Sequence, residues 1–219
     1  AGWLSALFFE EDEIVSSRVL EGGSITSPNA GFGYADQLKG IVNGSPSVAF
    51  QRKPTVFEPD VEARGIRVVM DFGAPVGVHR VRFYPRNTVV PNPEAPFHSD
   101  FLRGYELLLN AQPISNASPN VLVARDTENE AAVVDIDIDP QYVRLLTLRS
   151  LTNVPFEIDE IDVFGTGYLQ RGVYLSDVID LGDRSTIGFV RWIEAIVGNP
   201  DFSGVSLRVR TGSDDSPIR

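Results

Sequence analysis

The stretch Gly40-Ile-Val-Asn-Gly-Ser-Pro-Ser-Val-Ala-Phe50 decides the fold class, together with Val68-Val-Met-Asp-Phe-Gly73 and Glu160-Ile-Asp-Val-Phe-Gly165. The first contains a tight Asn-Gly turn, the second is an apolar strand that ends in Asp-x-Gly, and the third is a late strand of alternating polarity. Short strands separated by turn signals are typical of sandwiches and barrels of antiparallel strands. We therefore predict an all-β protein, an antiparallel jelly-roll β-sandwich.

Strand patterns continue on both sides of these stretches. Two strands, 66–72 and 78–84, are predicted with a turn at 73–77 between them, and the period of two places Val81 and Phe83 on one face of the second strand. Arg80, Arg82 and Tyr84 fall on the opposite face, so one face is core and the other carries charge. Further strands are predicted over 104–110, 121–125, 133–138, 142–149 and 156–164.

Composition limits the classes of partner. The net charge is −11 and the isoelectric point is about 4.6, so a phosphate backbone is repelled and nucleic acid is not an expected partner. Hydrophobic residues make up 42% and charged residues 22%, which predicts a folded globular protein. The absence of cysteine excludes disulfides and weakly favours a bacterial or archaeal origin. No apolar run is long enough to span a membrane.

Catalytic signatures are absent from the sequence. Two histidines, His79 and His98, cannot make a three-histidine zinc site, and neither a nucleophile elbow nor a phosphate-binding loop occurs. A glycosidase needs only a pair of carboxylates, and the chain offers Asp135, Asp137, Asp139, Glu157, Asp159, Glu160 and Asp162. Their alternation along strands predicts a solvated sheet face instead, so we predict that the protein is not an enzyme and needs no cofactor.

Three parts of the chain are distinguished. Residues 1–14 form an apolar N-terminal arm that turns acidic, residues 15–166 form the sandwich, and residues 167–219 carry additional strands over 173–182, 188–197 and 205–210. The last part contains few strands for a second sandwich. Either these strands join the first domain or the sequence is a fragment of a longer protein.

The N-terminal arm permits two interpretations. A terminal element docked on the core is one. The other is an exposed arm that packs on a neighbouring subunit, because large apolar side chains are costly to leave in water. The assembly candidates are Trp3, Leu7, Phe8 and Phe9.

The order and spacing of several short motifs carry a family resemblance over roughly residues 15–165. Asn43-Gly44 with Phe50, Asp71-Phe-Gly73, Tyr142-Val-Arg144 and the closing Glu160–Gly165 strand occur in the same order as the motifs of the discoidin family, the coagulation-factor C-type, galactose-binding-like domains. The chain resembles this family. The resemblance implies an eight-stranded jelly roll that binds sugars, lipids or proteins through loops at one end, usually in secreted or cell-surface proteins.

The resemblance also implies where a ligand binds. Loops 28–36 and 86–101 fall where the family's ligand loops lie. Aromatic faces pack on the C–H surfaces of sugars and polar groups bond hydroxyls. The ligand-binding candidates are Phe32, Tyr34, Arg86, Phe97 and His98. The alternative is that these residues only cap the ends of the sandwich.

Carbohydrate-binding members of the family often hold a structural calcium ion near the first turn. The matching positions here are Asn43, Ser45, Val48 and Glu160, and only Glu160 keeps the family's carboxylate. A hard divalent cation needs several oxygens and compensating charge. Calcium at Asn43 and Glu160 is therefore disfavoured.

Residues 167–212 resemble the start of a second β-sandwich segment found after sandwich domains in bacterial surface proteins. Together these features predict a non-catalytic, extracellular or cell-surface module that recognises carbohydrate or another surface ligand through its end loops. The alternative is a structural subunit of an extracellular assembly or filament that self-associates through the arm and the late strands.

Overall fold

The computed structural model describes residues 8–31, 33–45, 48–89, 99–111, 120–168, 173–194 and 204–212, and the side chains of residues 8–12 and 166–168 are outside this description. In chain order the elements are β1 (Phe8–Ile14), a 3₁₀ helix (Ser16–Leu20), β2 (Ser24–Thr26), α1 (Ala35–Gly40), β3 (Phe50–Arg52), β4 (Arg67–Tyr84), β5 (Tyr105–Asn110), β6 (Val121–Asp126), β7 (Val134–Ser150), β8 (Phe156–Ile158) and β9 (Glu160–Tyr168).

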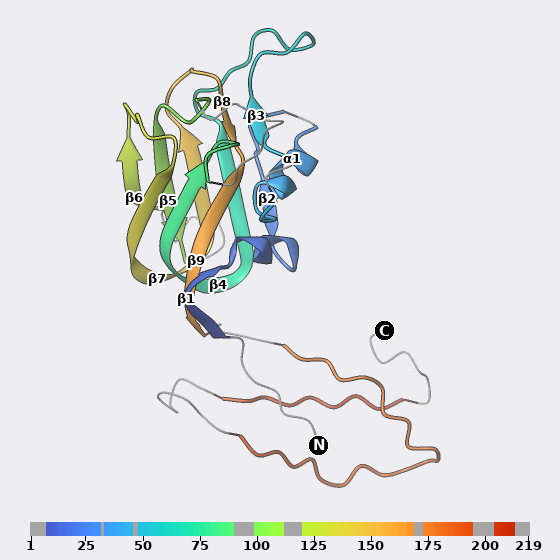
Figure 1. The fold of residues 1–219 in the computed structure, drawn as a ribbon. Helices are drawn as coiled ribbons and strands as arrows, with labels where there is room; N and C mark the ends of the chain where they lie inside the picture. The colour runs from blue at the N-terminus through green and yellow to red at the C-terminus, as the bar shows by residue number, and fades with distance from the viewer. Residues whose placement is uncertain are drawn as a thin grey trace. The chain divides into compact units, whose positions relative to one another are not determined.

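All strand pairs are antiparallel, which confirms the predicted fold class. One sheet has the order β1-β9-β4-β7-β5-β6, with β2 also paired to β4, and a second sheet consists of β3 and β8. Figure 1 shows the long strands β4 and β7 curving through the sandwich. The layers therefore belong to one continuous large sheet.

The pairing of β4 explains how one sheet makes two layers. Its first part, from Arg67 to Asp71, pairs with the end of β7, whereas its last part, from Val78 to Tyr84, lies between β9 and the start of β7. Val68 from the first part and Phe83 from the last part are buried in the same core cluster. Burial of these apolar faces is the main stabilising contribution to the fold.

The two predicted hairpins at 66–84 and 133–149 are wrong in one respect. Each is a single bent strand, β4 or β7, rather than two strands joined by a turn. The register of β4 against β7 shifts between Asp71 and Val76, and such an irregularity bends a strand without ending it. The predicted faces are confirmed, because Val81 and Phe83 are buried and Arg80 and Arg82 are on the outer face.

Gly73 lies at the bend of β4 with a φ of 76°, and a Cβ there would come within 2.4 Å of the Gly22 carbonyl oxygen. We expect Gly73→Ala to lower the free energy of unfolding by about 1–3 kcal/mol, measured by urea denaturation. Gly31→Ala is the matched control, since Gly31 has a φ of 87° and open space around its Cβ position. Equal losses in the two variants would show that the close approach to Gly22 costs nothing.

The segment Phe8–Ile14 is part of the sheet. As β1 it pairs with β9 at the edge of the sheet, with Ile14 opposite Phe164, and the following Val15 is buried. Trp3 and Leu7 lie outside the described residues, and the side chains of Phe8 and Phe9 are not described. The backbone therefore agrees with a terminal element docked on the core.

Residues Val173–Arg219 form a separate compact unit, so the boundary lies after Gly172. No strand or helix is assigned within 173–194 or 204–212, although additional strands are predicted there. Large apolar side chains such as Leu175, Phe189 and Trp192 are exposed in this unit. A few short strands without a packed apolar layer rarely form an independent sheet. The interpretation of this segment as the start of a second sandwich stays a prediction.

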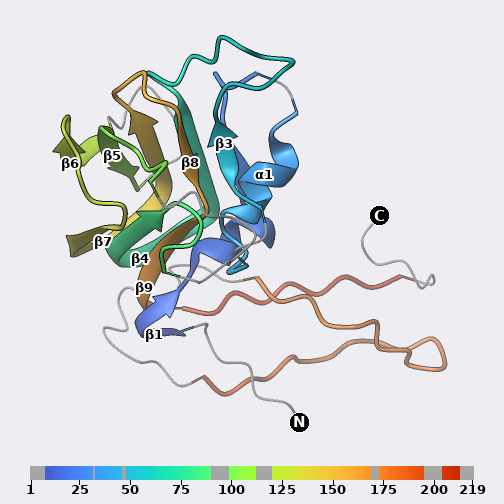
Figure 2. The same cartoon turned by 45° about the horizontal axis from the view of Figure 1, so that its top comes forward.

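Both bent strands begin and end at the same end of the sandwich. Arg67 and Tyr84 bound β4, Val134 and Ser150 bound β7, and Arg67 pairs with Arg149 while Phe83 pairs with Val134. The connecting segments 27–34, 53–66, 85–104, 127–133 and 151–155 therefore meet here, and we call this the loop end. Figure 2 brings this end forward, with β3, β8 and α1 beside it.

Candidate ligand-binding site

The small sheet of β3 and β8 supports the loop end. Phe50 in β3 is fully buried, and its ring packs edge-to-face on Phe156 of β8 at 6.4 Å and on Tyr34 at 5.5 Å between ring centroids. Gln51 donates its backbone N–H to the side-chain oxygen of Gln37 in α1 at 2.9 Å. The sheet thus holds the ends of several loops in fixed positions.

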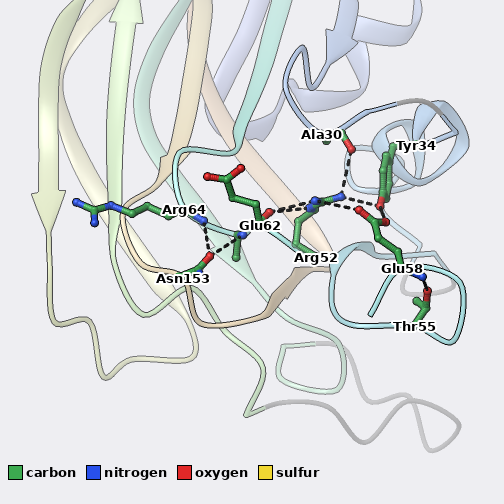
Figure 3. A network of polar contacts seen from close by, with 9 residues as sticks. Ala30, Tyr34, Arg52, Thr55, Glu58, Glu62, Arg64 and Asn153 are labelled. Atoms are coloured by element: carbon green, nitrogen blue, oxygen red, sulfur yellow. Dashed lines mark hydrogen bonds and ion pairs between the residues drawn. The ribbon is translucent and has the colours of Figure 1, made fainter. Parts of the chain in front are cut away.

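Arg52 is the centre of a polar network drawn in Figure 3. Only 3% of the residue is exposed. Its guanidinium donates to the carbonyl oxygens of Ala30 (3.2 Å) and Glu62 (3.0 Å), and to the Tyr34 hydroxyl (2.6 Å). It also lies 3.6 Å from the Glu58 carboxylate. One buried cation therefore joins the loop before α1 to the loop after β3.

Tyr34 is part of this network. Its hydroxyl donates to Glu58 at 3.2 Å, and its ring lies under the Arg52 guanidinium at 5.2 Å. Burial is the largest influence on the pKa of Tyr34 and raises it, with Arg52 opposing, so the hydroxyl keeps its proton. The predicted ligand-binding residue Tyr34 is committed to holding the loop.

The segment after β3 ends in a closed turn with an apolar tip. Thr55 donates its N–H to the Glu58 carbonyl oxygen, and Glu58 donates its N–H to the Thr55 hydroxyl, both at 2.9 Å. Between them Val56 is 94% exposed and Phe57 is 98% exposed. Large apolar side chains this exposed at the end of a fixed loop are typical of a contact surface.

Sequence reasoning missed Val56 and Phe57. The available signal is an apolar pair between Pro54 and Pro59, in a segment otherwise made of polar residues. Proline restricts the backbone, so such a pair is presented in a limited set of conformations. No strand periodicity surrounds it, and the pair is therefore easily taken for an ordinary loop.

Arg86 lies on the other side of the β3–β8 sheet. Glu157 in β8 is 1% exposed, and it accepts hydrogen bonds from the Arg86 backbone N–H (3.0 Å), Nε (3.1 Å) and terminal nitrogen (2.7 Å). Lys53 contacts both Glu157 (2.5 Å) and Asp100 (2.6 Å). The predicted ligand-binding residue Arg86 thus closes a buried ion-pair cluster at the base of the 86–101 loop.

The other three predicted ligand-binding residues, Phe32, Phe97 and His98, lie outside the described residues. Their role stays a prediction. Among the five candidates, the structure brings Tyr34 and Arg86 to the same end of the sandwich, on either side of β3 and β8.

The candidate calcium residues make internal hydrogen bonds. Glu160 accepts the Gly44 backbone N–H at 2.9 Å, and Asn43 accepts the Ser45 N–H at 2.7 Å. Burial raises the pKa of Glu160 to about 8, with Gly44 opposing and Asp162 and Asp159 adding to the rise. At neutral pH this carboxyl is mostly protonated and offers no charge to a cation. No group of three or more metal-ligating side chains occurs in the described part of the chain.

The predicted solvated face is confirmed for part of the carboxylate set. Asp135, Asp137 and Asp139 are exposed along β7. The prediction is wrong for the four acids of β8 and β9, which are all buried. Arg82 pairs with Asp162 at 2.7 Å, and burial raises the pKa of Asp159 to about 6. These acids lie within the protein and are satisfied by distant partners or protonation. The buried acids are Glu157, Asp159, Glu160 and Asp162.

None of the helices in the described ranges is long and apolar enough to cross a membrane. No protein-family model matches the chain, and none of the curated proteins matches it.

Solved structures similar to this chain include carbohydrate-binding modules. The family 32 module of Clostridium perfringens NanJ, in complex with galactose, is 16% identical over 64% of this chain and 92% of the module, with a TM-score of 0.46. Chitosan-binding module 1 of a Paenibacillus sp. IK-5 chitosanase/glucanase is 14% identical over 65% and 93%, with a TM-score of 0.47. A third module from Clostridium perfringens, in complex with GalNAc-β-1,3-galactose, is 14% identical over 64% and 92%, with a TM-score of 0.45. At these identities and TM-scores, no argument about the ligand of this chain rests on the similarity.

Proposed function

We propose that this protein is a non-catalytic module that binds carbohydrate through the loop end, outside the cell or at its surface. The observation that carries the proposal is Phe57, which is 98% exposed at the tip of a hydrogen-bonded turn. A flat aromatic ring in this position can stack on the C–H face of a sugar, with neighbouring polar groups available for hydroxyls.

The rigidity of the loop supports the proposal. Glu58, which closes the turn, bonds Tyr34 and lies beside Arg52, and Arg52 is in turn fixed to the Glu62 backbone. A loop held in one conformation before binding loses little conformational entropy on binding. The network around Arg52 thus positions Phe57 without contacting the ligand itself.

Phe57→Ala is expected to weaken binding of the glycan at least about tenfold, because aromatic anchors dominate the binding energy of such surfaces. The glycan is first identified on a glycan array with the full chain, and affinity is then measured by isothermal titration calorimetry. The unfolding midpoint should stay unchanged, since almost all of the side chain is already in water.

Leu122→Ala is the matched control, because Leu122 is an exposed apolar residue in β6, 50% exposed and away from the turn. It should bind the glycan as the unchanged protein does. The proposal is contradicted if no glycan binds, or if both variants keep full affinity.

A further inference from the structure

The outer face of the large sheet carries a row of arginines near the loop end. Arg67 in β4 pairs with Arg149 in β7, Arg149 pairs with Glu106 in β5, and Glu106 pairs with Arg125 in β6. Neighbouring strands lie about 4.8 Å apart, so the row extends over roughly 14 Å across four strands. Arg64, in the loop that leads into β4, lies beside its first member. We call Arg64, Arg67, Arg125 and Arg149 the arginine row.

The arginine row lines a hollow in the surface. Its volume is about 550 Å³, and Asn29 and Glu106 contribute to its walls. The backbone N–H of Arg64 is held by the side-chain oxygen of Asn153 at 3.4 Å. In Figure 3 the Arg64 guanidinium extends away from the Arg52 network. The backbone is therefore anchored while the charged group is left to contact something else.

Positive charge in the hollow exceeds what the protein neutralises. Glu106, 5% exposed, pairs with Arg149 and lies 3.5 Å from Arg125. In the part of the chain that the structure describes, no ion pair or side-chain hydrogen bond involves the guanidinium groups of Arg64 and Arg67. Arg67 and Arg149 are directly opposite each other, and like charges in this position are destabilising.

A buried donor points to the same conclusion. The Nε atom of Arg149 is buried and has no hydrogen-bond partner among the described residues. An unsatisfied buried donor costs free energy, which an acceptor entering the hollow would recover. In a protein with a net charge of −11, four arginines gathered around one glutamate form a local site for an anion.

We propose that the arginine row binds an acidic polysaccharide, through carboxylate or sulfate groups spaced along its chain. Guanidinium groups bind such planar or tetrahedral anions through paired hydrogen bonds. A peptide partner would need apolar anchors, and Leu151 is the only large apolar residue in the described lining of this hollow. Nucleic acid is disfavoured by the net charge of the protein. The choice of a saccharide rests on the proposed function, whereas the anion site rests on the arginine row itself.

The test uses the full chain and four polymers in affinity electrophoresis and calorimetry. Polygalacturonate and its fully methyl-esterified form differ only in carboxylate charge, and dextran sulfate and dextran differ only in sulfate. We expect binding to one charged member of a pair and none to its neutral partner, with affinity falling as salt is added. The pair that shows this difference identifies carboxylate or sulfate as the group bound.

The variant is Arg64→Gln/Arg67→Gln, because these two arginines hold no ion pair within the described ranges and their loss leaves Glu106 paired. We expect at least about a tenfold loss of affinity for the charged polymer. The control is Arg18→Gln/Arg80→Gln, which removes the same charge from arginines paired with Glu21 and Asp135. Equal losses in both double variants would overturn the site, as would the absence of binding to either charged polymer.

Two further outcomes separate this inference from the proposed function. Equal affinity for polyglutamate or for a single-stranded oligonucleotide would overturn the assignment to a polysaccharide. If Phe57→Ala abolishes binding of a neutral glycan while the arginine double variant keeps it and no acidic polymer binds, the proposed function stands and this inference fails. Acidic-polymer binding that needs Arg64 and Arg67 but not Phe57 supports the inference even if every neutral glycan fails.

Discussion

Glu157→Gln is expected to lower the free energy of unfolding by about 3 kcal/mol. The carboxylate is buried and is the shared partner of Arg86 and Lys53, at 2.7 Å and 2.5 Å. Glutamine keeps the shape but removes the negative charge, so two cations that are themselves mostly buried lose their main compensation. An uncompensated buried charge is among the most costly defects in a folded protein. Urea denaturation followed by circular dichroism measures the loss.

Asp135→Asn is the matched control for Glu157→Gln. Asp135 forms an equally close two-point pair with Arg80, at 2.7 Å for both contacts, but on the outer face of β7. An exposed ion pair contributes about 0–1 kcal/mol, so the control should change stability little. If both variants lose the same amount, burial of the Glu157 cluster is not the source of its contribution.

The stability of the protein is expected to fall as the pH rises from about 4 to about 8. Burial raises the pKa of Glu160 from its ordinary value of 4.5 to about 8, and that of Asp159 from 3.8 to about 6. Between the ordinary and the folded pKa, the folded state holds a proton that the unfolded state has released. The stabilisation is therefore complete below about pH 4 and is lost as the pH passes through about 6 and then about 8.

Each retained proton changes the free energy of unfolding by about 1.4 kcal/mol per pH unit, so the total fall amounts to several kcal/mol. Urea denaturation at pH 5, 6.5 and 8 measures it. Glu160→Gln should flatten the profile between pH 6.5 and 8 and stabilise the protein at pH 8, because an amide oxygen can still accept the Gly44 N–H.

Asp135→Asn again serves as the control for the pH profile. The hydrogen bond from Arg80 lowers the pKa of Asp135, so this group adds stability that is lost only as the pH falls below its ordinary value. The fall between pH 5 and 8 should remain in this variant. A profile that stays flat in the unchanged protein would contradict the assignment of retained protons to Asp159 and Glu160.

Local sequence pattern predicted the strands and their faces well. The alternation in 78–84 and 133–139 places Val81, Phe83 and Val134 in the core, as the structure shows. It failed where the outcome depends on partners distant in the sequence. Glu157 and Asp162 look like members of a wet face, yet they are buried because Arg86 and Arg82 approach from 71 and 80 residues away.

The loop end shows the same division. Turn-forming residues predicted the loops, and the resemblance predicted that they carry the ligand, but neither reveals which side chains the loops hold inward. Tyr34 was selected because it is an aromatic residue in a loop, and it proves to be a fixed part of the Arg52 network. Phe57, with no pattern around it, is the residue presented to solvent.

The two bent strands have a mechanical consequence. Because β4 and β7 each run through both layers, the layers share continuous backbone on two of their strands. Sliding one layer over the other would require these strands to be stretched or their bends to move along the chain. The loop end, where four strand ends meet, is therefore carried on a frame that resists shear, and a pull applied there is distributed to both layers at once.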